Sequence, residues 1–416
     1  MAEGRGVMKR RRRDQDRDRA KLTGEPAGGL DRVVAVVQLS ILKPPDLKAG
    51  RLQPGRDSKP DDVRRACDQG SPRGLRTHHW AAIIVTSMDG SRLPDATQNP
   101  RFTGIRTFMR LPGGADEPSP DVAIVGIPFD TAASFRPGQR FGPSAVRDIS
   151  VLLRPSNQFH KINAFEKVRV VDTGDVPAIP GDIQRTYDLI AARYADLASS
   201  QVIPIGIGGD HSVTLGELRG LSKALGPVAL VQLDAHCDTW DNYWGVRYTH
   251  GTPFRRAVEE GVIDVAHSIQ VGMRGTEYAP GDLDESRRLG FEVITTPEML
   301  KRGPADIAAA IRKRVGDVPV FLTFDVDFFD PAYAPGTGTP EVGGPTSAFG
   351  LEVVQHLAGM RIIGFDTVEV LPALDSGQIT ALLAATLVFE FVALVAMDPT
   401  RSEAAHVSRA RPRNRP

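Results

Sequence analysis

The feature that most restricts the fold of this chain is a series of short, almost uninterrupted apolar runs. They are DVAIVG (121–126), QVIPIGIGG (201–209), GPVALVQLD (226–234), PVFLTFD (319–325) and RIIGFD (361–366). Runs without polar alternation are typical of strands that are covered on both faces. Loops and helical patterns separate them, so we expect βαβ units and a mostly parallel sheet between two layers of helices. Functional groups in such a fold collect beyond the carboxyl ends of the strands.

The segment TLGELRGLSKALG (214–226) shows how these connections are built. Its leucines recur at helical spacing, and Gly226 is placed where a helix would stop. Thr214 and Glu217 have the spacing of a capping box, so we expect them to begin the helix.

Length and composition exclude several classes of protein. A chain of 416 residues with 41% hydrophobic content is large enough for a substantial core. Lys plus Arg and Asp plus Glu both number 51, so the overall charge favours neither nucleic acid nor an anionic membrane as a partner. The cysteines, Cys67 and Cys237, stand far apart in the sequence, which indicates a reducing compartment. We therefore expect a cytoplasmic protein.

One apolar stretch, Ile379 to Met397, approaches the length of a membrane span. Glu390 interrupts it, and a carboxylate deep in hydrocarbon would cost about 2.5 kcal/mol or more. A buried closing helix of an α/β domain is therefore the prediction.

The two ends of the chain differ from the middle. Residues 1–90 are charge-dense and lack lasting periodicity, and residues 398–416 are Arg-rich, so we expect both to be disordered. The catalytic domain is predicted to span residues 91–397. Met88 precedes the segment SRLPDATQNPRFTGIRTF (91–108), with which this domain is expected to begin, so a chain starting at Met88 is expected to be sufficient for activity.

Metal-binding side chains follow three of the predicted strands. GGDHS contributes His211, LDAHCD contributes Asp234, His236 and Asp238, and FDVDFFDP contributes Asp325 and Asp327. On a pleated strand, residues at i and i+2 share a face, so we expect Asp234, His236 and Asp238 to point one way and Cys237 the other. The alternative is a polar loop that merely caps a buried strand.

Four carboxylates and two imidazoles in one pocket would repel each other without added positive charge. Two divalent cations would cancel the four negative charges. Oxygen and imidazole ligands without thiolate suit Mn²⁺ better than a structural zinc. The sequence therefore predicts a site for two Mn²⁺ ions per chain.

These motifs resemble those of the ureohydrolase superfamily of arginase and agmatinase, over roughly residues 91–397. The resemblance implies a three-layer α/β/α arginase-like fold around an eight-stranded sheet, a binuclear manganese centre, hydrolysis of a guanidino group to an amine and urea, and a homo-oligomer, either trimer or hexamer. It also implies that His211 and Asp238 hold one ion and His236 and Asp327 the other, with Asp234 and Asp325 bridging both.

Two further residues acquire roles from this resemblance. His250, in YTHGTPF, corresponds to the family's proton-shuttling histidine, and Glu369, in DTVEVLP, to the acid that grips the substrate guanidinium. A structural histidine and a surface charge are the respective alternatives. We count His250, Glu369 and Asp238 as catalytic residues, and expect Asp210 and Asp330 to lie in turns or to support the ligands.

The substrate is predicted to be a small guanidino compound. The loop WDNYWGVRYTHG keeps Asn242 but lacks the Ser-Gly-Asn element of arginases, and the neighbouring blocks are most similar to agmatinase. Agmatine, cleaved to putrescine and urea, is the first expectation. Guanidinobutyrase, guanidinopropionase and proclavaminate amidinohydrolase activities are alternatives, since Arg136, Arg140 or Arg247 could recognise a carboxylate, although structural pairing is favoured for each. A metal-binding regulator without activity is disfavoured because all six candidate ligands are present. The deacetylase branch of the superfamily is disfavoured because it commonly uses one zinc ion and a different site.

Overall fold

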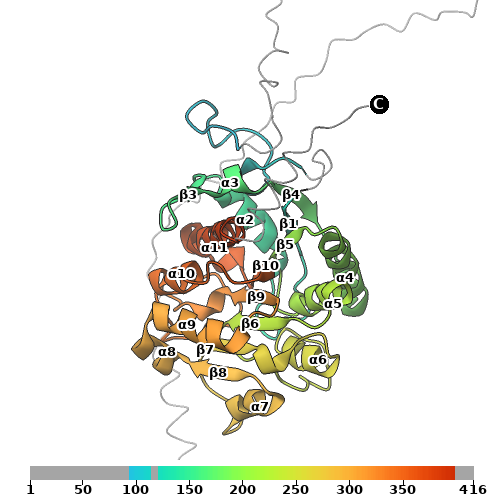
Figure 1. Ribbon diagram of the computed structural model, residues 1–416. Helices are drawn as coiled ribbons and strands as arrows, with labels where there is room; N and C mark the ends of the chain where they lie inside the picture. Colours follow the sequence, from blue (N-terminus) through green and yellow to red (C-terminus); the bar gives the residue numbers. More distant parts are fainter. Residues whose placement is uncertain (1–92, 114–119, 399–416) are drawn as a thin grey trace, which may run out of the picture. The chain divides into compact units, whose positions relative to one another are not determined.

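One sheet of eight parallel strands organises the part of the chain that the structure describes. The computed structural model describes residues 93–113 and 120–398 (Figure 1). The strand order is β4-β1-β5-β10-β9-β6-β7-β8, and all neighbours run parallel. The strands are β1 Val122–Gly126, β4 Val170–Asp175, β5 Ile203–Ile207, β6 Ala229–Leu233, β7 Ile269–Met273, β8 Glu292–Thr295, β9 Val320–Asp325 and β10 Ile362–Val368. The predicted parallel eight-stranded sheet is confirmed.

The five apolar runs of the sequence all form strands, but three strands were not recognised. The missed strands are β4, β7 and β8. β4 ends in the polar residues DTGD, β7 carries a glutamine at its second position, and β8 has only four residues. Each therefore lacks the long apolar signal that identified the other strands.

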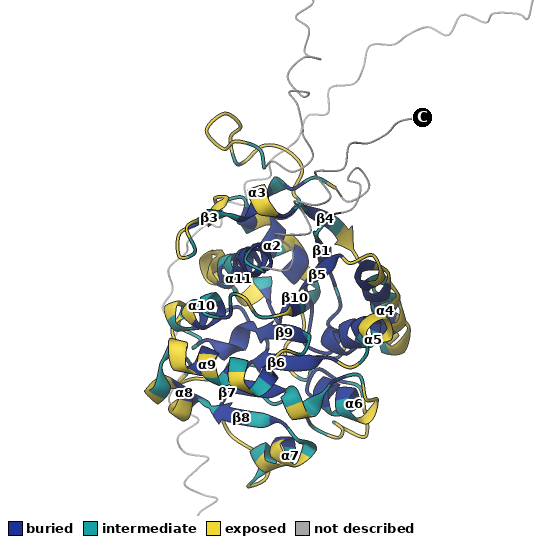
Figure 2. Cartoon of the chain, viewed as in Figure 1, coloured by how far each residue is buried: buried dark blue, intermediate teal, exposed yellow. Residues whose placement is uncertain are grey.

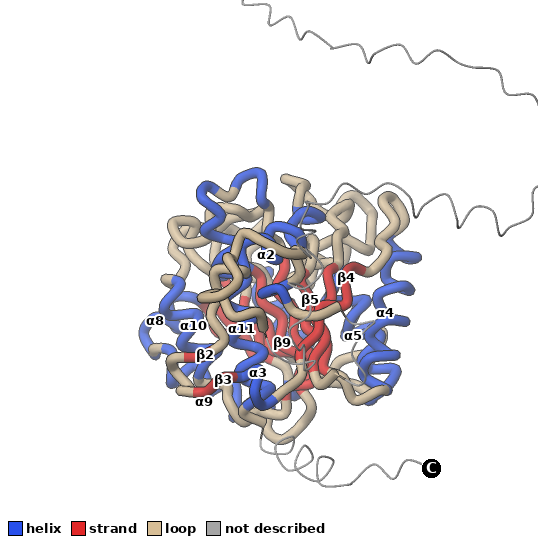
Figure 3. Tube along the Cα trace, turned by 90° about the horizontal axis from the view of Figure 1, so that it is seen from above, coloured by secondary structure: helices blue, strands red, loops and turns tan. Residues whose placement is uncertain are grey.

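Helices cover both faces of the sheet (Figures 1 and 3). One layer contains α4 Ile183–Ser199, α5 Val213–Leu225 and α6 Pro253–Glu259, and α7 Asp282–Leu289 packs at its edge. The other contains α2 Gly142–Ser150, α8 Thr296–Arg302, α9 Pro304–Val315, α10 Ser347–Gln355 and α11 Ile379–Ala396, with the short α3 Ala164–Lys167 and the hairpin β2 Ser156–Asn157 and β3 Ile162–Asn163.

Strand residues alternate between the two resulting cores. In β1, Val122 and Ile124 belong to the core beneath α11, whereas Ala123 and Val125 belong to the core beneath α4 and α5. Figure 2 shows the sheet and the inward faces of these helices as buried. Burial on both faces explains why the strands appear as continuous apolar runs.

Helix α5 forms as expected but does not begin with a capping box. Thr214 Oγ1 donates to Asp366 Oδ2 at 2.6 Å, and Glu217 Oε1 accepts from the Tyr194 hydroxyl at 2.6 Å. Both side chains are fully buried, so they bond to neighbouring elements rather than to the helix end. The prediction that Gly226 ends the helix is confirmed, with φ of 82°.

The long apolar stretch forms α11, which lies inside the fold. It is long and apolar enough to cross a membrane, but 83% of its apolar window is buried by the surrounding structure. Glu390 accepts hydrogen bonds from Asn157 at 2.7 Å and Gln355 at 2.9 Å, so its carboxylate is satisfied in the interior. The predicted buried closing helix is confirmed.

The predictions for the two ends of the chain, residues 1–90 and 398–416, lie outside the described residues apart from Asp398.

Candidate metal centre

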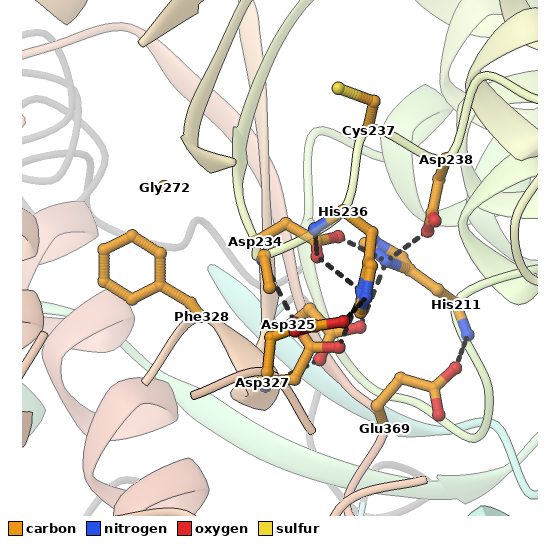
Figure 4. A network of polar contacts seen from close by, with 12 residues as sticks. His211, Asp234, His236, Cys237, Asp238, Gly272, Asp325, Asp327, Phe328 and Glu369 are labelled. Atoms are coloured by element: carbon orange, nitrogen blue, oxygen red, sulfur yellow. Dashed lines mark hydrogen bonds and ion pairs between the residues drawn. The ribbon is translucent and has the colours of Figure 1, made fainter. Parts of the chain in front are cut away.

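The candidate ligands follow strands that are adjacent in the sheet. His211 follows β5, Asp234 follows β6, Asp325 ends β9, and Glu369 follows β10. These strands are neighbours in the order β5-β10-β9-β6. Because all four run parallel, their carboxyl ends meet at one edge, and Figure 4 shows the side chains converging there.

Three residues form a group that we call the deep subsite: His211, Asp234 and Asp238. His211 Nδ1 lies 3.0 Å from Asp234 Oδ2 and 2.9 Å from Asp238 Oδ2. Asp325 Oδ2 approaches the same nitrogen to 3.3 Å. The predicted grouping of His211 with Asp238 is therefore reproduced in space.

The protein core holds the deep subsite in place. The His211 side chain is 1% exposed, and the ring of Phe254 packs edge-on against it at 5.1 Å between centroids. His211 Nε2 lies 2.8 Å from Thr323 Oγ1, and its main-chain N–H donates to Glu369 Oε1 at 2.8 Å. The orientation of the imidazole is thereby fixed by buried neighbours.

A second group, which we call the outer subsite, consists of Asp234, His236 and Asp327. His236 Nδ1 lies 3.0 Å from Asp327 Oδ2 and 3.7 Å from Asp234 Oδ1. The His236 side chain is 31% exposed, so this subsite borders solvent. Asp234 belongs to both subsites, as expected for a bridging ligand, whereas bridging by Asp325 stays a prediction.

The strand-alternation argument for this convergence is wrong. β6 ends at Leu233, so Asp234, His236 and Asp238 lie in a loop, and Asp238 has φ of 52°. Instead, Asp234 Oδ1 accepts from His236 N–H at 2.6 Å, and Asp325 Oδ1 accepts from Asp327 N–H at 2.8 Å. The i, i+2 spacing is thus that of turns in which an aspartate bonds to the chain two residues on.

The electrostatics of the cluster fit bound cations. Burial and the neighbouring Asp327 carboxylate raise the pKa values of Asp234 and Asp325 above the ordinary range. Burial alone would lower the pKa of His211, but Asp234, Asp238 and Asp325 raise it well above its usual value. His211 Nδ1 and Asp327 Oδ2 are buried and face other candidate ligands at 2.9 Å and 3.0 Å, but neither atom makes a hydrogen bond of good geometry. Divalent ions between these atoms would relieve the repulsion and satisfy both of them.

His250 and Glu369 form a buried pair beside the centre. His250 Nδ1 lies 2.9 Å from Glu369 Oε1, and Gln139 donates to Glu369 Oε2 at 2.8 Å. The Ser134 N–H donates to His250 Nε2 at 3.0 Å, which places the hydrogen of the neutral ring on Nδ1. Burial alone would lower the pKa of His250, but Glu369 raises it to about 9.

Residues beside the ligands behave largely as expected. Asp210 accepts from the main-chain N–H groups of Ala132 and Ser212, and Asp330 accepts from turn N–H groups of its own loop. The Cys237 sulfur points away from the ligands (Figure 4), and burial raises the thiol pKa to about 12. The Cys237 side chain therefore packs in the interior, as expected. The conformation of the loop, rather than the alternation of a pleated strand, directs it away from the ligands.

Two of the three arginines considered for substrate recognition form local ion pairs. Arg140 contacts Asp130, and Arg247 contacts Glu259 at 2.6 Å. Arg136 is exposed, stacks over Phe135 at 4.8 Å from the ring centroid and lines the cavity described next.

A cavity of ≈ 550 Å³ opens onto the centre. Its inner wall includes His236, Asp238, Asp325 and His250. Its outer wall is an aromatic rim, formed by Trp240, Tyr243, Trp244 and Tyr278, with Arg136, Glu277 and Glu341 nearby. The Trp240 ring lies 5.4 Å from that of Tyr278, and the Tyr243 ring 5.6 Å from that of Trp244.

Sequence reasoning missed Ser134, Gln139 and Arg274. Ser134 and Gln139 contact His250 and Glu369 from the loop after β1, and Arg274 contacts main-chain carbonyls around Asp327. None of the three lies in a motif with metal-ligand spacing. In addition, the contacts of Arg274 are to main-chain oxygens, which every residue type possesses, so the sequence does not reveal its partners.

Comparisons with known proteins agree with this geometry. Residues 120–393 match the sequence model described as "Arginase family". The chain is 43% identical to a guanidinopropionase of Pseudomonas aeruginosa, over 74% of this chain and 97% of the relative. It is 45% identical to an agmatinase of Serratia proteamaculans, over 67% and 88%. The solved proclavaminate amidino hydrolase of Streptomyces clavuligerus superimposes with a TM-score of 0.69 at 39% identity, covering 72% of this chain and 99% of that one. The chain belongs to the Arginase family.

Proposed function

We propose that this Arginase-family enzyme uses two Mn²⁺ ions to hydrolyse a linear guanidino compound, with agmatine as the first candidate. The protein is a guanidino-compound amidinohydrolase of its family. The finer proposal rests on one observation: two ligand groups that share Asp234 border the cavity that His250 also lines. In this proposal agmatine is cleaved to putrescine and urea.

The deep and outer subsites would each hold one ion. Their donors are carboxylate oxygens and imidazole nitrogens, a set that suits Mn²⁺. When bound, such ions lower the pKa of water and orient it for attack on the guanidinium carbon. Asp234 would contact both ions, because its two oxygens face the two histidines separately.

His250 would move the proton that the departing amine needs. In the proposed cycle the protonated ring keeps one hydrogen on Nδ1, held by Glu369, and presents the other on Nε2, beside the cavity. Ser134 Oγ lies 2.6 Å from Nε2 and would accept that hydrogen once the ring is protonated, when Nε2 no longer accepts from the Ser134 N–H. Glu369 is 1% exposed, so its support of His250 follows from its contacts, and its grip on the substrate guanidinium is part of the proposal.

The aromatic rim favours a substrate that is cationic at its distal end. Ammonium groups bind well over tryptophan and tyrosine rings. Glu277 and Glu341 add negative charge to the same cavity. Agmatine carries an amine at the end opposite its guanidino group, so the rim would receive that ammonium while the guanidinium faces the metals.

Arg136 supports a second candidate, a guanidino acid. Its guanidinium is exposed and lines the cavity, where it could pair with a carboxylate. The similarity to a guanidinopropionase points the same way.

Urea release from agmatine, 3-guanidinopropionate, 4-guanidinobutyrate and arginine would decide between the candidates, with metal content measured on the same preparation. We expect two Mn²⁺ per chain, loss of activity on chelation, and the highest kcat/KM with agmatine. An Arg136→Gln variant should leave agmatine turnover close to the wild-type value. A higher kcat/KM for a guanidino acid that collapses in Arg136→Gln would replace agmatine by the second candidate.

A further inference from the structure

Arg274 follows β7 directly, and its side chain and main-chain N–H together join three segments around the outer subsite. The residue is half-buried, and its guanidinium donates hydrogen bonds to main-chain carbonyl oxygens. A guanidinium has five N–H donors in a rigid planar fork, so one side chain can fix several carbonyls at once.

The first segment is the turn that carries Asp327. Arg274 Nη2 donates to the Asp327 carbonyl at 2.7 Å and to the Phe329 carbonyl at 3.1 Å, and Nη1 donates to the Phe328 carbonyl at 2.9 Å. Three consecutive carbonyls are therefore held from one side. The direction in which the Asp327 carboxylate leaves the chain depends on this turn.

The second segment is the loop between Asp234 and His236. The main-chain N–H of Arg274 donates to the Ala235 carbonyl at 2.9 Å. The Ala235 N–H in turn donates to Asp327 Oδ1 at 3.1 Å. Arg274 thus fixes the position of one ligand loop relative to the other.

The third segment carries Glu341. Arg274 donates to the Glu341 carbonyl from Nη2 at 2.8 Å and from Nε at 3.3 Å. Glu341 Oε1 lies 3.8 Å from His236 Nε2, the nitrogen that does not face Asp327. Carboxylates in this position orient a ligating imidazole and increase its basicity. A side chain at Gly275 would place its Cβ 2.5 Å from Glu341 Cδ, so that glycine also shapes the contact.

All three segments therefore belong to the outer subsite. Among the hydrogen bonds of the described residues, none joins Arg274 to His211 or Asp238. We propose that Arg274 is a positioning residue that sets the metal affinity of the outer subsite and leaves that of the deep subsite unchanged. The inference rests on the proposed binuclear function.

The chain offers a matched control in Arg314. Its half-buried guanidinium also donates to main-chain carbonyls, those of Ser268 at 3.0 Å, Val265 at 3.2 Å and Gly290 at 2.6 Å. None of these belongs to a metal ligand. Substituting Arg314 therefore removes a comparable set of hydrogen bonds without removing any contact to the candidate metal centre.

The test measures Mn²⁺ binding to the full-length chain in graded metal buffers, without substrate. We expect Arg274→Met to bind one ion with wild-type affinity and the second at least about tenfold more weakly, which is the loss typical of removing support behind a ligand. Electron paramagnetic resonance should then change from a spin-coupled pair to an isolated ion. Arg274→Lys, which keeps the charge but not the fork, should give a smaller loss, and Arg314→Met should retain both ions.

Adding His236→Asn to Arg274→Met should cause little further loss of metal, whereas adding His211→Asn should remove both ions. If Arg274→Met is insoluble, Gly344→Ala provides a second perturbation, because its Cβ would lie 2.5 Å from the main-chain nitrogen of Asp330 and 2.6 Å from Arg274 Nη2 and would displace both. Unchanged affinities, equal weakening of both ions, or the same loss in Arg314→Met would overturn the proposal. A wild-type chain that binds fewer than two ions would instead refute the proposed binuclear function.

Discussion

The deep and outer subsites share Asp234 but are held by different means. His211 packs against the Phe254 ring and hydrogen-bonds to Thr323, so buried core side chains fix the deep subsite. His236 is 31% exposed, and the outer subsite depends on hydrogen bonds between loops that follow separate strands. The contrast teaches that loss of core packing should mainly affect the deep subsite, and loss of hydrogen bonds between the loops the outer subsite.

Removing Asp234, the ligand that both subsites share, should impair both subsites and have the largest effect on metal binding and activity. Asp234→Asn removes the negative charge that faces both histidines, so both ions should be lost and urea release should fall by orders of magnitude. Metal analysis and a urea assay would measure this. Cys237→Ala is the control, because its sulfur points away from the same loop and it should keep both ions. Near-wild-type turnover with two ions in Asp234→Asn would contradict the assignment.

A residue outside both subsites should separate chemistry from metal binding. His250→Asn keeps a polar side chain but cannot titrate near neutrality, so kcat should fall about 10²- to 10⁴-fold while two Mn²⁺ stay bound. Steady-state kinetics and metal analysis on the same sample would show this. Loss of manganese from His250→Asn but not from Asp238→Asn would mean that proton shuttle and ligand had been exchanged.

The pair of His250 and Glu369 predicts a change in pH dependence. Glu369 raises the pKa of His250 to about 9, so a protonated His250 is present below that value and is lost as pH rises through it. Glu369→Gln removes the charge that causes the shift, so the alkaline limb of kcat should move to lower pH. A pH–rate profile would measure the displacement, with Arg247→Gln as a control, because Arg247 pairs with Glu259 rather than with His250. An alkaline limb that stays in place would show that another group titrates.

The smallest effect should come from the packing around His211. Phe254→Leu leaves a small void beside the imidazole and should lower the stability by about 1 kcal/mol. The affinity for the deep ion should weaken modestly, while the outer ion, which depends on Arg274, should bind as before. Thermal unfolding with and without Mn²⁺ would measure both effects. Equal weakening of the two ions would remove the distinction between the subsites.

Much of the sheet and of the candidate metal centre could be predicted from the sequence. The predictions that were wrong failed for physical reasons that the structure shows. The apolar runs predicted the central strands, and the motifs predicted His211, Asp234 and Asp327 as neighbours, because parallel strands end at one edge. The side chains meet through aspartate turns rather than strand pleating, since β6 ends before Asp234.

The hydrogen-bond partners of some other residues cannot be recognised from a single sequence. Arg274 bonds to main-chain oxygens, which every residue possesses, so no residue type reveals its partners. Thr214 and Glu217 matched a helix-capping pattern, but burial gave them partners on other elements. A local sequence pattern therefore predicts the hydrogen-bond partners of a side chain poorly where tertiary contacts determine them.

The position of β10 has a consequence for biosynthesis. This strand is the last of the sheet in the sequence, yet it lies between β5 and β9 at the centre. Its pairing with β5 joins residues more than 150 positions apart, such as Thr367 and Ile207, and such non-local pairing is intrinsically slow to form. A nascent chain that has not yet released β10 from the ribosome therefore carries the candidate ligands but lacks the strand between β5 and β9, so the proposed metal centre would be completed only when synthesis is nearly finished.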